Sequence, residues 1–247
     1  QTSTQASRFL QASTFGPNSG SIDELVEIGY SDWLKHQINQ PAVSILDRAA
    51  PLLSAGYVEN SKTGVITHVP ISLFYENAIL GEEQLRLRAT FALSQIFVVG
   101  SQEGGIYFDG LGFSRYIDIL QEGAFGNFRD LLEEITFNPV MGEFLTYKGN
   151  RKADPETGAA PDENFAREIM QLFTIGLYEL NLDGSLRLDS EGRPIETYNN
   201  EDVVGLAKVF TGLSMDGVPF DTNPDSILSP SRVTRMVMFN EHHANES

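Results

Sequence analysis

The densest set of side chains that could do chemistry lies in one segment, from Asp162 to Phe173. Its apolar residues follow helical spacing and define one core-facing stripe. Asn164, Glu168 and Gln171 stand at i, i+4 and i+7, so they share a second stripe, with Glu163 and Arg167 as an i, i+4 pair beside it. If this surface faces a cleft, Glu168 could act as a general base or metal ligand and Arg167 could hold an anion.

The same helix also has a structural interpretation, which we favour. Charged groups that are buried must be paired, so these residues could form an ion-pair and amide network that fixes helix packing. In the alternative in which this surface faces a cleft, Glu168 is the candidate catalytic residue of the chain. The candidate binding residues of this helix are Glu163, Asn164, Arg167 and Gln171.

A second group of polar side chains lies in an apolar segment at residues 82–88. Arg86 and Arg88 are the candidate binding residues there. Paired with Glu163 or Glu168, these arginines would complete a structural network. Facing a pocket, they would bind a carboxylate, phosphate or sulfate. The structural alternative is again favoured.

A third candidate, Asn127, follows a turn bracketed by Gly123 and Gly126. It stands at an expected helix start, where backbone N–H groups could hold an anion. The simpler alternative is that Gly126 only supplies a backbone angle at the helix entry.

The sequence has few side chains that could bind a metal ion or a cofactor. It has no cysteine and four histidines, none of them in a His-x-x-Glu or His-Glu-x-x-His frame. We predict no metal site. Nucleophile-elbow, Walker and dinucleotide motifs are absent from the sequence, so it points to no particular cofactor.

The elements expected to position these residues are mainly helical. Ser21 to Glu24 has the pattern of a capping box, Gly29 is expected to stop that helix, and Gly81 to break a long apolar segment over 71–99. Helices are also expected from Asp162 to Gly176 and from Asn199 or Asn200 to Phe210.

One Asp-Gly turn at 183–184 and one Glu-Gly turn at 191–192 predict a small β-hairpin insertion near 178–198. The polar segment 151–161 is expected to be a mobile loop. The fold class is therefore mainly α, a single multi-helix domain over 1–247.

Charge and hydropathy exclude some functions. Among 247 residues, 34 are acidic and 17 are lysine or arginine, for a formal net charge of −17. Such a surface repels a phosphate backbone, so nucleic acid is not an expected partner. No apolar run is long enough for a transmembrane segment. The cysteine-free, acidic composition is compatible with export.

Six strings together resemble the bacterial family of uncharacterised proteins called DUF1800, from about residue 8 to the end. They lie at 7–17, 84–88, 91–98, 123–132, 161–173 and 209–212. The resemblance implies a large, mainly helical, commonly exported protein, often encoded beside a second exported protein. Family members usually run further, and the segment at His242 and His243 lacks their Gly and Lys motif, so an N-terminal part is expected.

The resemblance supplies no established activity, and two functions stay open. The first is an exported binding or assembly protein, secreted or periplasmic, acting with a partner protein or a surface polymer. The second is a secreted hydrolase or lyase on an extracellular carbohydrate or peptide, using Glu168 with Arg86, Arg88 and Arg167.

Overall fold

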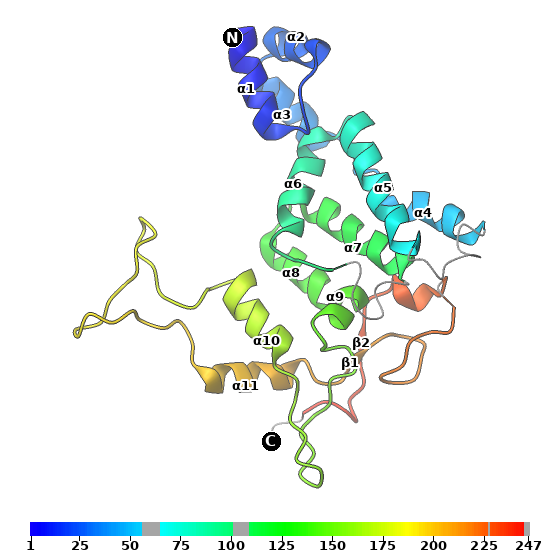
Figure 1. Ribbon diagram of the computed structural model, residues 1–247, viewed down its shortest axis with the longest axis vertical. Helices are drawn as coiled ribbons and strands as arrows, with labels where there is room; N and C mark the ends of the chain where they lie inside the picture. Colours follow the sequence, from blue (N-terminus) through cyan, green and yellow to red (C-terminus); the bar gives the residue numbers. More distant parts are fainter. Residues whose placement is uncertain (56–64, 101–108, 227, 245–247) are drawn as a thin grey trace. The chain divides into compact units, whose positions relative to one another are not determined.

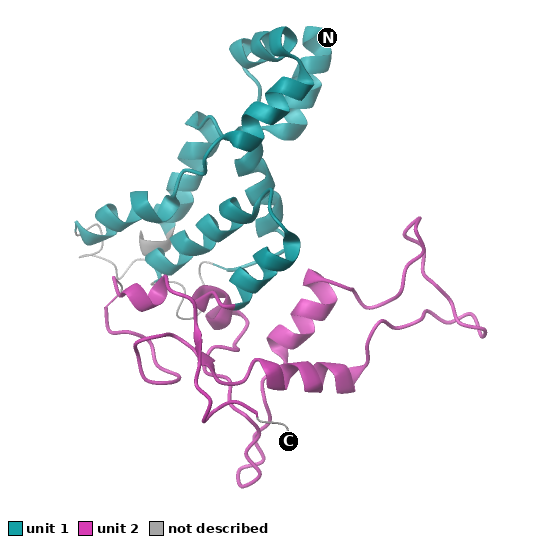
Figure 2. Ribbon diagram, turned by 180° about the vertical axis from the view of Figure 1, so that it is seen from behind, with its two compact units in different colours: residues 1–136 teal, residues 137–247 magenta. Residues whose placement is uncertain are grey.

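The computed structural model describes residues 1–55, 65–100, 109–226 and 228–244 (Figure 1). The chain divides into two compact units, unit 1 (Gln1–Thr136) and unit 2 (Phe137–Ser247), shown in Figure 2. Helices dominate, and the described β-structure is a small antiparallel pair and isolated bridges, as the sequence predicts. The prediction of a single domain stays a prediction, because two compact units can fold together or separately.

Helices form the whole described secondary structure of unit 1. In chain order they are α1 (Ser3–Ser13), α2 (Ser19–Ile28), α3 (Tyr30–Asn39), α4 (Ile45–Ser54), α5 (Val65–Leu80), α6 (Gln84–Ser94), α7 (Gly110–Gly123) and α8 (Phe128–Thr136).

The first three helices share a small hydrophobic core. Ala6 and Leu10 of α1 meet Leu25 of α2 and Trp33 of α3, and each of the four is at most 4% exposed. The ring of Phe9 stands edge-on to the Trp33 indole at a centroid distance of 5.3 Å. Burial of these side chains holds α1, α2 and α3 together.

Some helices begin and end where the sequence predicts, and one does not. Gly29 ends α2 with a φ of 83°, which favours glycine, and a break at Gly81 separates α5 from α6. The capping box predicted at Ser21 to Glu24 is wrong. Asn18 caps α2 instead, and its side chain accepts from the N–H of Ser21, so the helix begins earlier.

A buried carboxylate links α7 to the start of α4. Asp118 accepts hydrogen bonds from the backbone N–H groups of Ile45 at 2.7 Å and Leu46 at 3.1 Å, and from the hydroxyl of Ser44 at 2.7 Å. Burial raises the pKa of Asp118 above its ordinary value, although these hydrogen bonds oppose the shift. Asp118 thus satisfies helix donors that have no partner inside α4.

Unit 2 combines shorter helices with the small sheet. Its elements are α9 (Pro139–Phe144), α10 (Asn164–Glu168), the π-helical turn η2 (Ile169–Phe173), α11 (Asn200–Val209), β1 (Leu213–Ser214), the 3-10 turn η3 (Pro230–Arg232) and β2 (Val237–Met238). Strands β1 and β2 are antiparallel, with Leu213 opposite Met238.

Aromatic rings form the centre of unit 2. Tyr147 stacks on Phe165 of α10 at a centroid distance of 4.0 Å, and Phe210 meets Phe165 edge-on at 4.7 Å. Phe173 of η2 reaches the same ring at 6.4 Å. These contacts fix α10 and η2 against the end of α11.

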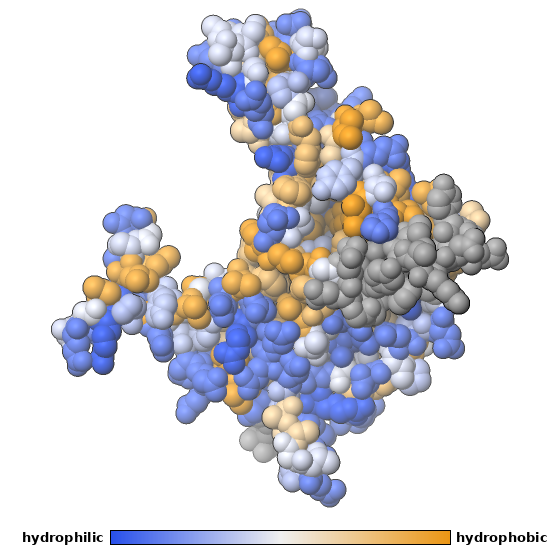
Figure 3. All heavy atoms as spheres, viewed as in Figure 1, coloured by the Kyte–Doolittle hydropathy of each residue, from blue (hydrophilic) through white to orange (hydrophobic). Residues whose placement is uncertain are grey.

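The predicted hairpin region is a projecting arm between η2 and α11 (Figure 1). Isolated antiparallel bridges join Tyr178 to Glu196, Leu180 to Leu186 and Leu188 to Pro194. The two-residue strands of the sheet lie elsewhere, at β1 and β2. Figure 3 shows hydrophobic residues along the arm, and they include the fully exposed Leu182.

The segment 151–161 is folded back on itself. The N–H of Asp154 donates to the carbonyl of Ala159 at 2.9 Å, and the N–H of Gly158 donates to the carbonyl of Asp154 at 2.8 Å. Its mobility stays a prediction. Among the described residues, no helix has both the length and the apolar character required to cross a bilayer.

Candidate functional site

The predicted ion pair of unit 2 is present. Nη2 of Arg167 lies 2.9 Å from Oε2 of Glu163, one turn earlier, and both side chains are partly exposed. A partly exposed pair of this kind is screened by water and stabilises the fold only weakly. The Arg167 guanidinium therefore keeps surface that a ligand could contact.

Glu168 has an unusual setting. Its Oε2 atom is sealed from solvent and has no hydrogen-bond partner among the described residues. The helix then changes to the π-helical turn η2 directly after it. The sequence predicts a continuous helix to Gly176, so this turn is a correction, and π-helical turns are frequent at functional sites.

The other predicted residues of this helix are less enclosed. Asn164 is exposed and Gln171 is half-buried. A cavity of about 180 Å³ lies beside Arg167, with Tyr178 and Tyr198 among its lining residues. This volume is smaller than that of ordinary ligand pockets, which begin at about 300 Å³.

Arg86 binds backbone carbonyls inside unit 1. It donates to the carbonyls of Gln121 at 2.8 Å, Gln40 at 3.1 Å and Ile38 at 3.3 Å. These contacts tie the end of α3 to α7. Burial lowers the pKa of Arg86, an effect that Glu83 opposes.

Arg88 and Asn127 also have local partners. The Arg88 guanidinium lies over the rings of Phe15 and Phe91, at 5.5 and 6.0 Å from their centroids. The side chain of Asn127 accepts from the N–H of Arg129 at 2.9 Å and so supports the start of α8. Each candidate of unit 1 thus has a contact that stabilises its own unit.

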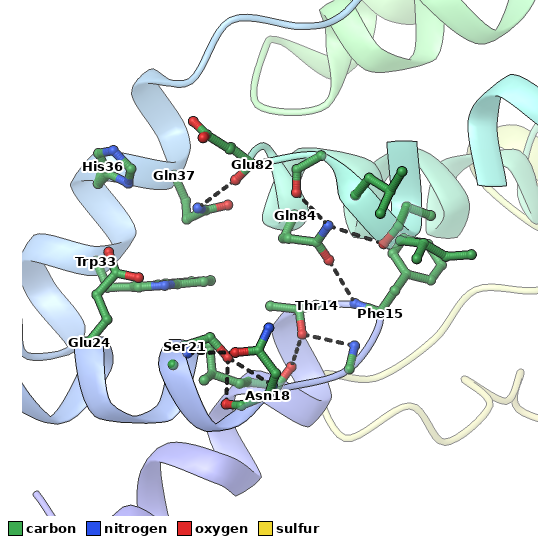
Figure 4. Close-up of a pocket in the computed structure, with 17 residues that line it drawn as sticks. Thr14, Phe15, Asn18, Ser21, Glu24, Trp33, His36, Gln37, Glu82 and Gln84 are labelled. Carbon is green, nitrogen blue, oxygen red and sulfur yellow. Dashed lines mark hydrogen bonds between the residues drawn. The ribbon is translucent and has the colours of Figure 1, made fainter. Parts of the chain in front are cut away.

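The larger site is a pocket in unit 1 of about 600 Å³, within the range of ligand pockets. It lies where the first three helices meet the junction of α5 and α6, and Figure 4 shows the side chains around it. The lining residues are Leu10, Thr14, Phe15, Gly16, Asn18, Gly20, Ser21, Glu24, Trp33, His36, Gln37, Ala78, Ile79, Leu80, Gly81, Glu82 and Gln84.

Two glutamines brace the walls of this pocket (Figure 4). Gln37 of α3 donates to the carbonyl of Glu82 at 2.9 Å and accepts from the N–H of Leu85 at 3.0 Å. Gln84 donates to the carbonyls of Ala78 at 3.1 Å and Gly81 at 2.9 Å. Both side chains therefore hold the turn between α5 and α6 in place.

The turn between α5 and α6 requires glycine. The N–H of Gly81 donates to the carbonyl of Asn77 at 2.7 Å, and a Cβ at position 81 would lie 2.6 Å from that same oxygen. A larger residue would displace the turn that carries Glu82 and Gln84.

Trp33 is one of the lining residues of the pocket and is 4% exposed. In Figure 4 its indole extends from α3 between Glu24 and the glutamines. The indole nitrogen has no hydrogen-bond partner among the described residues, yet it is not one of the sealed polar atoms that lack a partner. Trp33 lines the pocket, and its N–H is a donor that keeps access to solvent and has no acceptor in the described part of the chain.

The charged groups of the pocket are acidic. Glu24 and Glu82 are exposed at its edge, and neither has an ion-pair partner within the described part of the chain. His36 contacts Gln40, with 2.8 Å between Nε2 atoms. The described lining residues include no lysine or arginine. The field in the pocket consequently favours cations.

Metal binding has no support in the described ranges. No three His, Cys, Asp or Glu side chains gather there in a group that could hold an ion.

The chain matches one known protein family over nearly its whole length. A family model described as "Protein of unknown function (DUF1800)" matches residues 8–246. The chain belongs to the DUF1800 family. A search of curated proteins and a search of solved structures found no significant match.

Sequence reasoning missed the pocket of this DUF1800 chain. One signal was available, because Trp33 and Gln37 are four residues apart and so share the buried face of α3. An amide on an apolar stripe must find hydrogen-bond partners. The identity of those partners, Glu82 and Leu85, depends on tertiary packing and cannot be read from α3.

Proposed function

We propose that this chain is a binding or assembly protein that docks a segment of a partner protein in the pocket of unit 1. The observation that carries the proposal is the free indole N–H of Trp33, a side chain that is 4% exposed and lines a pocket of about 600 Å³. This donor is open to an acceptor that a ligand supplies.

A protein segment fits the edge of the pocket better than a sugar does. Ile79 and Leu80, at the end of α5, are 76% and 74% exposed, and Figure 3 shows hydrophobic residues there. Peptides carry carbonyl acceptors for an indole N–H and apolar side chains that can cover this edge. Sugars offer hydroxyls but no apolar side chain of that size.

The test offers peptides and glycans to the purified chain in parallel. A displayed peptide library and an array of neutral and acidic oligosaccharides are both screened for binding. Binders are then measured on Ile79→Lys, which changes an exposed residue of the pocket edge, and on Val209→Lys, which changes an exposed hydrophobic residue of α11 outside the pocket.

We expect peptides to be selected, and their binding to be lost in Ile79→Lys and kept in Val209→Lys. Oligosaccharides that bind with the same dependence on Ile79, without any peptide, would assign the pocket to a surface polymer and overturn the proposal. No binder of either kind would overturn it as well.

Export and the identity of the partner are further parts of this proposal. The chain is proposed to be secreted or periplasmic and to act with a second exported protein encoded nearby. Fractionation of cells that produce the protein tests this, and recovery only from the cytoplasm would contradict it.

A second candidate function rests on Glu168, as a hydrolase or lyase acting with Arg167 of the same helix. Its support is the sealed, unpartnered Oε2 atom of Glu168 next to the π-helical turn η2. Glu168→Gln should abolish turnover of an extracellular carbohydrate or peptide while the fold is retained. If this variant unfolds, Glu168 is part of the scaffold.

A further inference from the structure

We infer that the segment docked in unit 1 is basic, with lysine or arginine side chains that pair with Glu24 and with Glu82 while its backbone accepts from Trp33. This inference rests on the proposed docking function. It adds the chemical class of the partner segment, and it stands on three groups that line the same pocket.

Two unpaired carboxylates give the pocket a negative charge. Glu24 comes from α2 and Glu82 from the turn after α5, and neither carboxylate has an ion-pair partner in the described ranges. Several other acidic residues of the chain are paired with arginine, as Glu122 is with Arg115 at 2.7 Å. Two unpaired carboxylates at one pocket are complementary to a cationic side chain.

The indole donor of Trp33 favours a peptide over a bare cation as the ligand. The Trp33 N–H is a donor without an acceptor among the described residues, and a metal ion or a simple ammonium ion offers it none. A peptide supplies both groups, because its carbonyl accepts from the indole while its side chain carries the positive charge. Apolar neighbours of that side chain can cover Ile79 and Leu80, which are largely exposed.

The charge of the chain disfavours acidic peptide segments as ligands of the pocket. The whole chain has a formal charge of −17, and the described pocket lining contributes Glu24 and Glu82 without a lysine or arginine. Like charges at a contact disfavour association, while opposite charges raise the rate of encounter. A basic segment is therefore favoured both on approach and when bound.

The experiment uses three blocked hexapeptides that share two leucines and differ at two positions, which are lysine, glutamine or glutamate. Binding to the full chain is measured by calorimetry and by the emission of Trp33, the single tryptophan of the chain. The variants are Glu24→Gln, Glu82→Gln and the double variant. Glu27→Gln, an exposed change on α2 outside the pocket, is the matched control.

The lysine peptide is expected to bind most tightly and the glutamate peptide most weakly. Each single variant should weaken the lysine peptide by about two- to fivefold and the double variant by about tenfold, while Glu27→Gln leaves it unchanged. Added salt should weaken the lysine peptide and leave the glutamine peptide nearly unaffected.

Two outcomes overturn the inference and are distinguishable. If the glutamine peptide binds as tightly as the lysine peptide and the variants have no effect, the charge preference is wrong while docking in the pocket stands. If peptides selected from the library also fail to bind, the docking function itself is wrong and the inference falls with it.

Discussion

Gln84 accepts a hydrogen bond from the backbone N–H of Phe15, with 3.2 Å between Oε1 and the nitrogen. The same side chain donates to two carbonyls at the end of α5. One amide therefore joins the segment after α1 to the junction of α5 and α6. The pocket exists because this junction is held in place, so its shape depends on Gln84 directly.

Replacement of Gln84 by alanine should both destabilise the chain and weaken peptide binding. Three hydrogen bonds are lost, and partly buried backbone groups are left without a partner. The expected loss in the free energy of unfolding is about 1–3 kcal/mol. Denaturation in urea measures it, with Gln11→Ala on the exposed side of α1 as control. Equal stability of the two variants would show that Gln84 does not brace the pocket.

The stability of the chain should depend on the protonation of Asp118. Its pKa is raised in the folded state, mainly by burial, so the folded chain holds this proton more tightly than the unfolded chain. The resulting stabilisation is present below the ordinary value of 3.8 and is lost as the pH rises through the raised pKa.

Asp118→Asn removes this titration, so it isolates the effect of the carboxyl group. The stability of the wild type relative to Asp118→Asn should fall as the pH rises from about 3 to about 6. Urea denaturation at several pH values gives the difference in free energy of unfolding. A difference that grows with pH would mean that the pKa is lowered by the contacts with Ile45 and Leu46 instead.

The single-domain prediction can be tested with a substitution in unit 2 and a probe in unit 1. Phe165→Ala removes a buried ring from the aromatic cluster and should cost about 3–5 kcal/mol. If the chain unfolds as one domain, the transition reported by Trp33 fluorescence should shift with it. A Trp33 transition that stays at the wild-type denaturant concentration would show that Gln1–Thr136 unfolds independently.

Glu168 should have no part in peptide docking. The proposed docking pocket lies in unit 1, whereas Glu168 belongs to α10 of unit 2. The lysine peptide should therefore bind to Glu168→Gln with the affinity of the wild type, as measured by calorimetry. A loss of binding in this variant, with the fold intact by circular dichroism, would move the site to unit 2.

The sequence predicts the helices well where local rules decide them. Gly29 ends α2 because a positive φ is required there, and Asn199 caps α11 by accepting from the N–H groups of Glu201 and Asp202. Such signals act within a few residues and can be read without a structure. Local rules fail where two neighbouring signals compete, as Asn18 and Ser21 do at the start of α2.

The pocket could not be predicted because its parts come together only through tertiary contacts. Gln84 meets Phe15 across 69 residues, and Gln37 meets Glu82 across 45. Arg86 shows the same limit. From the sequence alone it could bind a ligand, whereas the structure shows it holding the carbonyl of Gln121 and those at the end of α3.

The indole N–H resonance of Trp33 tests the central claim most directly. The chain has one tryptophan, so a nitrogen–proton correlation spectrum of the labelled protein contains one indole signal. The docking account predicts that this signal moves downfield as the lysine peptide is added, because the free donor gains an acceptor. An indole signal that stays in place at a peptide concentration where calorimetry shows saturation would contradict it.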